Sequence, residues 1–200
     1  SSDLEKYLNI ILSETDRLTN LTSNLLELNS FNGDNVLLDI TTFNICETIV
    51  QTVNTLEGTA AKKEISFVLD YNTQKELLVE ADESKIHQVL YNLIDNAVKF
   101  SHNNSEIKIS LRKKGAKVFV SVKDSGIGIP KESLNKVFDR FYKTDISRGK
   151  DKRGTGLGLS ISKEIIQAHN QTINVVSTVD VGTEFVFTLK YHSKKQEASS

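Results

Sequence analysis

The feature that most constrains the fold of this sequence is a helical segment with two asparagines four residues apart, followed by two glycine-bearing segments. On a helix, Asn92, Asn96 and Lys99 return to nearly the same angle, so their side chains form one polar stripe. The apolar residues of the same segment form the opposite, buried stripe: Ile86, Leu90, Leu93 and Ala97. Amide oxygens suit Mg²⁺, which keeps several waters and takes its other ligands from phosphates. The stripe therefore points to a magnesium nucleotide site, although alone it also fits an ordinary half-exposed helix.

Two glycine-bearing segments follow this helix. The first, Asp124-Ser-Gly-Ile-Gly128, ends a predicted strand. A carboxylate there can accept a hydrogen bond from the exocyclic amine of adenine, and the glycines let a flat ring approach the backbone. The alternative is an ordinary Asp-Ser-Gly turn. The second, Gly154-Thr-Gly-Leu-Gly158, opens a predicted helix, whose backbone amides and dipole can hold phosphate oxygens. Neither the dinucleotide fingerprint nor the P-loop signature fits this sequence.

The segment between the two glycine segments is basic. Residues 140–153 contain six Lys or Arg against two acidic residues, a net charge of +4. We expect this segment to close over a triphosphate as a lid. A solvated, lysine-rich loop is the alternative.

Hydrophobic periodicity predicts a mixture of helices and strands after residue 36. Helices are expected at 46–62, 82–100 and 156–169, and strands at 37–43, 65–71, 77–80, 106–113, 117–123, 172–177 and 183–190. Neighbouring strands joined by short turns, with the helices grouped, predict an α+β fold, in which a mixed sheet is covered on one face by helices.

The N-terminal segment has a different pattern. Within residues 3–31, Leu4, Ile11, Leu18 and Leu25 recur at sevenfold spacing, which is typical of a coiled-coil or bundle helix. Such a helix cannot bury its own apolar stripe, so we expect it to form a homodimer, with packing against the chain's own globular part as the alternative. We divide the chain into 1–33 (helix), 36–190 (globular domain) and 191–200 (polar tail).

Composition excludes several classes of protein. A formal net charge of −1 argues against a nucleic-acid surface, and the single cysteine, Cys46, excludes an internal disulfide. No apolar run is long enough to cross a bilayer, so we expect these residues to be cytoplasmic and to make no membrane contact. The chain starts Ser-Ser and contains no methionine. We therefore expect it to be a piece of a longer protein, and an inner-membrane anchor in that parent stays open.

Four motifs in order give residues 36–190 a family resemblance. Asn92–Ser101 looks like the N box, and 124–128 like the first glycine box, of the catalytic ATP-binding domain of bacterial sensor histidine kinases. Phe138-Asp-Arg-Phe141 resembles the F box of that family, and 154–158 its second glycine box. Gly182-Thr-Glu-Phe185 matches a weaker feature of the same domain. The wider superfamily includes gyrase, Hsp90 and the MutL mismatch-repair ATPases.

The resemblance implies a fold and a set of site residues. The fold is a two-layer α/β sandwich of the Bergerat type, binding ATP and Mg²⁺. Asn96 and Asn92 would be the metal ligands, Asp124 would select adenine, and Asn92, Lys99 and Arg140 would have catalytic roles at the phosphates. The other nucleotide-binding residues would be Phe100, Gly126, Gly128, Gly154, Thr155, Gly156, Leu157, Gly158 and Thr183. Phe138 and Phe141 would anchor the lid.

The residue at position 92 indicates the reaction. Hydrolysing relatives have glutamate there as the base that activates water, whereas an asparagine cannot take a proton at neutral pH. We therefore expect poor hydrolysis, and transfer of the γ-phosphoryl group of ATP to a histidine, which needs no such base. This is the reaction of a histidine kinase in two-component signal transduction, whose partner is a response regulator. The alternatives are a hydrolysing ATPase of the gyrase or Hsp90 type and a nucleotide-sensing interaction module.

The acceptor histidine is not recognisable in this sequence. The family's motif of His, an acidic residue and a nearby Pro is missing, and we expect His87, His102, His169 and His192 to be structural or solvated. The helix at 3–31 resembles the second helix of the family's dimerisation hairpin. We therefore expect the helix that carries the acceptor to be absent from this chain.

Overall fold

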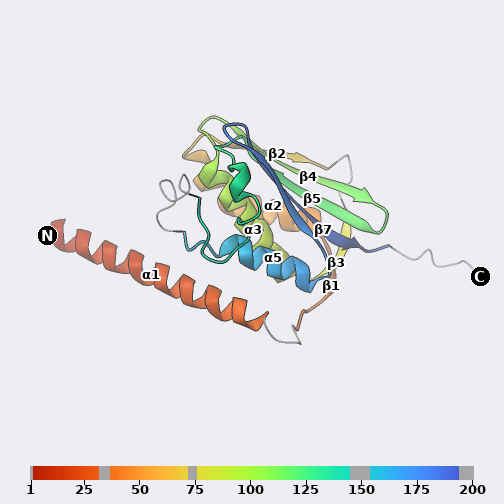
Figure 1. Cartoon of the computed structure of the whole chain (residues 1–200), viewed down its shortest axis with the longest axis horizontal. Helices are drawn as coiled ribbons and strands as arrows, with labels where there is room; N and C mark the ends of the chain where they lie inside the picture. Colours follow the sequence, from red (N-terminus) through yellow and green to blue (C-terminus); the bar gives the residue numbers. More distant parts are fainter. Residues whose placement is uncertain (1, 32–36, 72–75, 145–153, 194–200) are drawn as a thin grey trace, which may run out of the picture.

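One mixed sheet organises the computed structural model, which describes residues 2–31, 37–71, 76–144 and 154–193 (Figure 1). Its strands are β1 (Thr41–Asn44), β2 (Ser66–Asp70), β3 (Leu78–Ala81), β4 (Glu106–Lys114), β5 (Lys117–Lys123), β6 (Ile173–Thr178) and β7 (Gly182–Tyr191). They lie in the order β1-β3-β7-β5-β4-β2, and β6 pairs with β7. The β2–β4 pair is parallel, whereas β1–β3, β3–β7, β4–β5, β5–β7 and β6–β7 are antiparallel.

Three helices pack on one face of this sheet: α2 (Ile45–Ala61), α3 (Glu83–Phe100) and α5 (Gly158–Ala168). In β4, Ile107, Ile109 and Leu111 are buried while Lys108 and Arg112 are exposed, so alternate residues face the core. A short 3-10 helix, η1 (Lys131–Ser133), follows β5. The predicted α+β sandwich with helices on one face is confirmed.

Helix α3 forms where the asparagine stripe predicted it. Asp82 caps its N-terminus by accepting a hydrogen bond from the backbone N–H of Lys85, an interaction generally worth about 1 kcal/mol. The four predicted apolar residues are buried, as are Val89, Ile94 and Val98 between them. The apolar stripe holds α3 on the sheet and α5, and leaves the asparagine stripe facing a pocket.

The boundaries of some elements differ from the predicted ones. Strand β1 begins at Thr41 rather than at residue 37, because only Thr41–Asn44 find a partner strand, in β3. The parallel pairing of β2 with β4 and the helix η1 were not predicted. Both depend on which segments meet in space, and hydrophobic periodicity does not contain that information.

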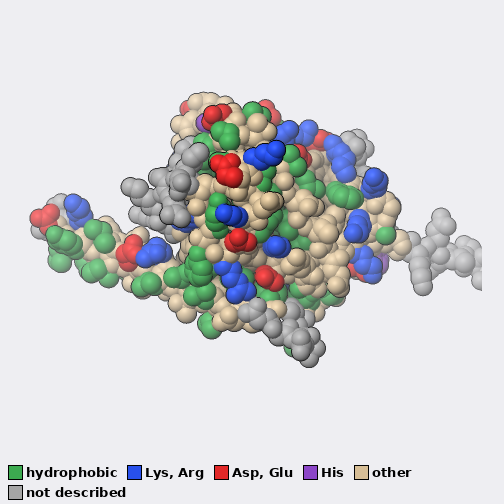
Figure 2. Space-filling model, in the orientation of Figure 1, with side chains coloured by type: hydrophobic (Ala, Val, Ile, Leu, Met, Phe, Trp, Pro, Cys, Tyr) green, Lys and Arg blue, Asp and Glu red, His purple; other side chains and the backbone are tan. Residues whose placement is uncertain are grey.

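Helix α1 (Ser2–Ser30) packs on the domain at one end only, and the predicted homodimer stays a prediction. Its C-terminal end packs on the domain: Leu28 is fully buried, and the Glu27 carboxylate accepts hydrogen bonds from Lys85 Nζ (2.7 Å) and Gln88 Nε2 (2.6 Å) of α3. Its N-terminal part projects away from the sheet (Figures 1 and 2). There Leu4, Tyr7, Leu8, Ile11 and Leu18 are between 49% and 65% exposed.

Across residues 2–31, 37–71, 76–144 and 154–193, none of the helices combines the length and apolar character needed to span a bilayer.

Candidate nucleotide site

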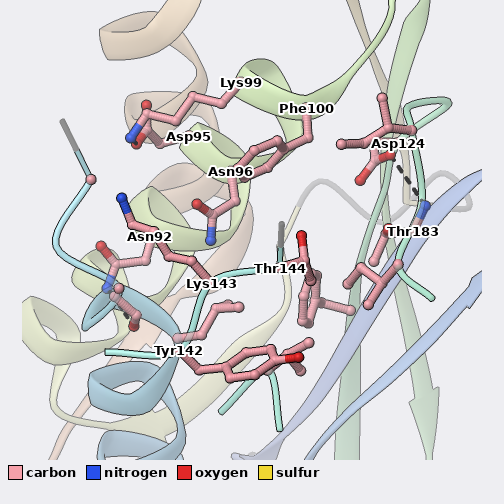
Figure 3. A pocket seen from close by; sticks show the side chains of 18 of the residues that line it. Asn92, Asp95, Asn96, Lys99, Phe100, Asp124, Tyr142, Lys143, Thr144 and Thr183 are labelled. Atoms are coloured by element: carbon pink, nitrogen blue, oxygen red, sulfur yellow. Dashed lines mark hydrogen bonds and ion pairs between the residues drawn. The ribbon is translucent and has the colours of Figure 1, made fainter. Parts of the chain in front are cut away.

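The predicted motifs meet at one pocket of about 230 Å³ between α3, the C-terminal end of β5 and the start of α5 (Figure 3). Eleven predicted site residues line it: Asn92, Asn96, Lys99, Phe100, Asp124, Gly128, Gly154, Thr155, Gly156, Gly158 and Thr183. These residues come from three separate segments of the chain and from β7, so folding brings together what the sequence keeps apart.

Three predicted residues do not line the pocket wall. Gly126 packs behind it, because a Cβ there would lie 2.3 Å from the carbonyl oxygen of Phe100. Leu157 contributes a fully buried core side chain. Arg140 lies with Nη2 4.0 Å from Glu164 Oε1 on α5. The predicted lid lies partly outside the described residues, since 145–153 are not described.

The two phenylalanines of the F box have different environments. The ring of Phe138 packs edge-on against that of Phe185, with centroids 6.1 Å apart. The side chain of Phe141 is 56% exposed, and its backbone N–H donates to the carbonyl of Gly156 at 3.0 Å. Only Phe138 anchors its segment through its side chain in this structure, whereas Phe141 does so through its backbone.

Asp124 is held rigidly at one end of the pocket. Its Oδ1 accepts hydrogen bonds from the backbone N–H groups of Gly126 (2.9 Å) and Thr183 (3.1 Å). Its other oxygen is turned toward the cavity (Figure 3). Gly182 makes this approach of β7 possible, because its φ is +139° and a Cβ there would lie 2.0 Å from the carbonyl oxygen of Asp124. The result is a fixed hydrogen-bond acceptor beside a groove with little side-chain bulk.

The environment of Asp124 also makes its charge sensitive to pH. Burial raises the pKa of this carboxyl to about 6, and the two backbone N–H donors offset only part of that effect. The folded state therefore keeps the proton to a higher pH than the unfolded state, whose ordinary value is 3.8. The contribution of Asp124 to stability is thus present at low pH and lost as the pH rises from about 4 to about 6.

Ligand binding should show the opposite pH dependence. If the ionised carboxylate accepts from adenine, affinity for an adenine nucleotide should be about tenfold weaker at pH 5 than at pH 7, since only about a tenth of the carboxyl is ionised at pH 5. Calorimetric titrations with adenosine, which has no titrating phosphate, would measure this. Affinity that is unchanged between these pH values would contradict the role of Asp124.

The opposite end of the pocket carries the asparagine stripe. Asn96 extends into the middle of the cavity, and Asn92 turns toward α5, where its Nδ2 donates to the carbonyl of Gly158 at 3.1 Å. Lys99 Nζ forms an ion pair with Asp95 Oδ2 at 2.7 Å, so its ammonium lies at the rim. Among the residues that the structure describes, no three His, Cys, Asp or Glu side chains gather as a metal site. At this end of the pocket the amide oxygens of Asn92 and Asn96 can serve a hard cation, beside the Asp95 carboxylate that pairs with Lys99.

Tyr142, Lys143 and Thr144 line the pocket from the segment that was predicted as the lid. Sequence reasoning missed seven other residues of the pocket wall: Asn24, Asp95, Ile127, Ile129, Val137, Leu159 and Phe185. Asp95 was within reach of sequence reasoning, because it precedes Lys99 by one helical turn. Asn24 was not, since its place in the pocket follows from how α1 packs on the domain.

Lys63 was also missed, and it supports the site from behind. Its Nζ donates to three carbonyl oxygens at the end of α3, those of Val98 (2.7 Å), Lys99 (3.0 Å) and Ser101 (2.8 Å). A cation there satisfies carbonyls that the helix leaves open and interacts favourably with its dipole. Lys63 therefore helps to fix the turn that presents Phe100 to the pocket.

Two of the four histidines have their ring nitrogens committed to structure. His169 Nε2 accepts from the backbone N–H of Asp82 (2.9 Å), and Nδ1 donates to the carbonyl of Ile165 (2.7 Å). His192 Nδ1 lies 3.0 Å from Glu80 Oε1. Of the others, His87 is half-buried on α3 and His102 is exposed. None of the four lines the pocket.

Known proteins resemble this chain across the whole pocket. Residues 81–193 match the family described as histidine kinase-, DNA gyrase B- and HSP90-like ATPase. The chain is 35% identical over 194 residues to the sensor histidine kinase WalK of Bacillus subtilis, covering 96% of this chain and 31% of WalK. It thus spans about a third of the length of that relative.

Solved structures agree with this similarity. Full-length ShkA in complex with AMPPNP superimposes with a TM-score of 0.84 over 97% of this chain and 40% of its own, and at 23% identity it shows the fold alone. Histidine kinase ThkA, in complex with the response regulator TrrA, has a TM-score of 0.75 and 34% identity over 96% of this chain and 53% of its own.

Proposed function

This chain belongs to the histidine kinase-, DNA gyrase B- and HSP90-like ATPase family and contains the catalytic ATP-binding domain of a sensor histidine kinase, and we propose that it transfers the γ-phosphoryl group of bound ATP to a histidine. The observation that carries this proposal is the amide at position 92, where Asn92 lines the pocket and its Nδ2 donates to the carbonyl of Gly158. An amide is not a base at neutral pH, whereas hydrolysing relatives have glutamate at this position. Phosphoryl transfer to an imidazole needs no base, because a neutral ring nitrogen already has a lone pair.

The adenine end of the pocket would be read by Asp124, with Phe100, Gly128 and Thr183 around the base and Gly126 packed behind the wall. The fixed Oδ1 contacts support this role, since they leave the second carboxylate oxygen for the exocyclic amine. The phosphates would lie along the start of α5, against Gly154, Thr155, Gly156, Leu157 and Gly158. The glycines there, and the burial of the Leu157 side chain in the core, leave backbone amides within reach of phosphate oxygens.

Magnesium fits the donor set at the other end. Asn96 would be the principal ligand and Asn92 its neighbour, and both offer the neutral oxygens that Mg²⁺ accepts beside phosphates and water. When bound, the ion neutralises charge on the β- and γ-phosphates. Lys99 and Arg140 would add positive charge at the terminal phosphate. Arg140 would have to leave Glu164 to do so.

The domain division and the partners extend this proposal. Residues 1–33 would be the second helix of a dimerisation domain, 36–190 the catalytic domain and 191–200 a tail. The exposed apolar stripe of α1 would then pair with a second copy of the chain. A response regulator would receive the phosphoryl group, as the complex of ThkA with TrrA supports. The domain would work in the cytoplasm, where ATP is available, whether or not the parent is anchored in the inner membrane.

One experiment has three outcomes, which separate this function from its two alternatives. The chain is incubated with γ-labelled ATP, Mg²⁺ and a separately supplied acceptor-helix domain from a sensor kinase. Acid-labile, base-stable phosphate on the acceptor supports phosphotransfer. Steady release of inorganic phosphate at many turnovers per minute would instead favour an ATPase of the gyrase or Hsp90 type, and binding without either product would favour a nucleotide-sensing module.

A further inference from the structure

We propose that Ser162 is a positioning residue, which fixes the side-chain amide of Asn92 with its oxygen facing the pocket. The proposal rests on the proposed function, because it concerns the same nucleotide site. Ser162 lies on α5 outside the four motifs, and its side chain is fully buried.

Three hydrogen bonds connect Ser162, Gly158 and Asn92. The Ser162 hydroxyl donates to the carbonyl oxygen of Gly158 at 2.9 Å, one turn back on α5. Asn92 Nδ2 donates to that same carbonyl at 3.1 Å and to Ser162 Oγ at 3.3 Å. Figure 3 draws the dashed contact of Asn92 on the side of the residue that faces α5.

The direction of these bonds follows from the chemistry of the partners. A carbonyl oxygen can only accept, and a serine hydroxyl has one proton. Because Ser162 donates this proton to the Gly158 carbonyl, its oxygen faces Asn92 with lone pairs. With the hydroxyl proton directed to Gly158, both groups that α5 turns toward Asn92 are acceptors, and the NH₂ end of the carboxamide satisfies both at once.

This orientation matters because the terminal torsion of asparagine is broad and roughly two-fold. The flipped amide has almost the same shape but would turn a donor NH₂ toward the phosphates and the cation. A cation needs the oxygen instead. Ser162 thus acts on the metal end of the site through Asn92, without touching the ligand itself.

The same arrangement predicts which residues position 92 accepts. An aspartate or glutamate there would bring a carboxylate toward the Gly158 carbonyl, which can only accept, and would take Ser162 away from that carbonyl if the hydroxyl turned to donate to it. The site therefore selects an amide at position 92, and introducing the glutamate of the hydrolysing relatives would not by itself create a hydrolysing site.

The test is calorimetry of AMPPNP binding to the full 200-residue chain, with Mg²⁺ and with EDTA. Ser162→Ala should weaken binding about fivefold in Mg²⁺, the effect of one ordinary hydrogen bond, and should leave binding in EDTA unchanged. In an Asn92→Ala background the same change should have no further effect. Ser162→Thr, which keeps the hydroxyl, should restore the magnesium-dependent affinity.

Ser160→Ala is the matched control. Ser160 is also buried on α5 and donates to the carbonyl of Leu157 at 2.8 Å, but it has no recorded hydrogen bond to Asn92. Equal losses in Mg²⁺ and EDTA, or equal effects of the two alanine variants, would show a purely structural role and overturn the proposal. If the unmodified chain binds no AMPPNP in either condition, the proposed function itself fails.

A second measurement needs no change at Ser162. In NMR spectra of the unmodified chain, the side-chain NH₂ of Asn92, assigned by its loss in Asn92→Ala, should exchange slowly with solvent because α5 holds both protons. Rapid exchange, as for an exposed amide, would refute the fixed orientation.

Discussion

Replacing Asp124 with asparagine should weaken ATP binding by at least about 100-fold at pH 7.5, which corresponds to about 2.7 kcal/mol. The backbone N–H groups of Gly126 and Thr183 both donate to Oδ1. In the variant, the amide oxygen would keep these two bonds, and the NH₂ group would take the place of the oxygen that faces the pocket. A donor would then meet the donor amine of adenine, so the bond to a charged acceptor is lost and an unsatisfied contact replaces it.

Calorimetry with ATP and Mg²⁺ measures this effect directly. Asp180→Asn is a suitable control, because Asp180 is exposed in the β6–β7 turn and its φ of +60° is one that asparagine tolerates. Asp124→Asn should keep its thermal stability at pH 8, since the substitution removes a buried charge. A folded variant that binds ATP within threefold of the unmodified chain would show that Asp124 does not select the base.

The sequence predicted those parts of the fold that depend on local periodicity. Strand β5 has the predicted bounds, 117–123, because its valines alternate and a turn at Gly115 joins it to β4 in a hairpin. Helix α3 was predicted within a residue of its start for a similar reason: Asp82 caps it and an apolar stripe runs its whole length. Local chemistry and the tertiary environment agree at these elements.

Contacts between distant, ordinary residues were beyond such reasoning. Lys63 is one of two adjacent lysines after α2, and nothing in its neighbours shows that its ammonium reaches the end of α3. Ser162 likewise looks like a helix residue of no special kind. Lys63 lies 35 positions from Val98, and Ser162 lies 70 positions from Asn92. These contacts exist only in the folded chain.

The glycines show an intermediate case. The sequence indicated that Gly126 must lack a side chain, and the structure supplies a different reason from the predicted one. Gly126 does not line the pocket, but its Cβ would collide with the Phe100 carbonyl, which also accepts a hydrogen bond from Ile127 at 3.2 Å. The sequence can thus show that a position needs glycine, whereas only the structure shows which atom a side chain there would meet.

Replacing Asn96 with alanine should remove most of the effect of Mg²⁺ on ATP binding and lower phosphotransfer to a supplied acceptor by at least about 100-fold, because a cation at the phosphates contributes several kcal/mol to charge stabilisation. Asn96 extends into the centre of the pocket, so truncation takes away its oxygen without disturbing the buried stripe of α3. Binding in EDTA should change little, since base and phosphate contacts remain.

The control for this variant is Asn54→Ala, the same substitution at an exposed position of α2. It should leave both affinity and transfer unchanged. Comparing each variant with and without Mg²⁺ separates a lost metal ligand from a damaged pocket, because damage would weaken binding in both conditions. If Asn96→Ala kept the full magnesium dependence of the unmodified chain, the ion would have to be held without Asn96. The carboxamide at 92, presented by Gly158 and Ser162, would then be the remaining protein ligand to test.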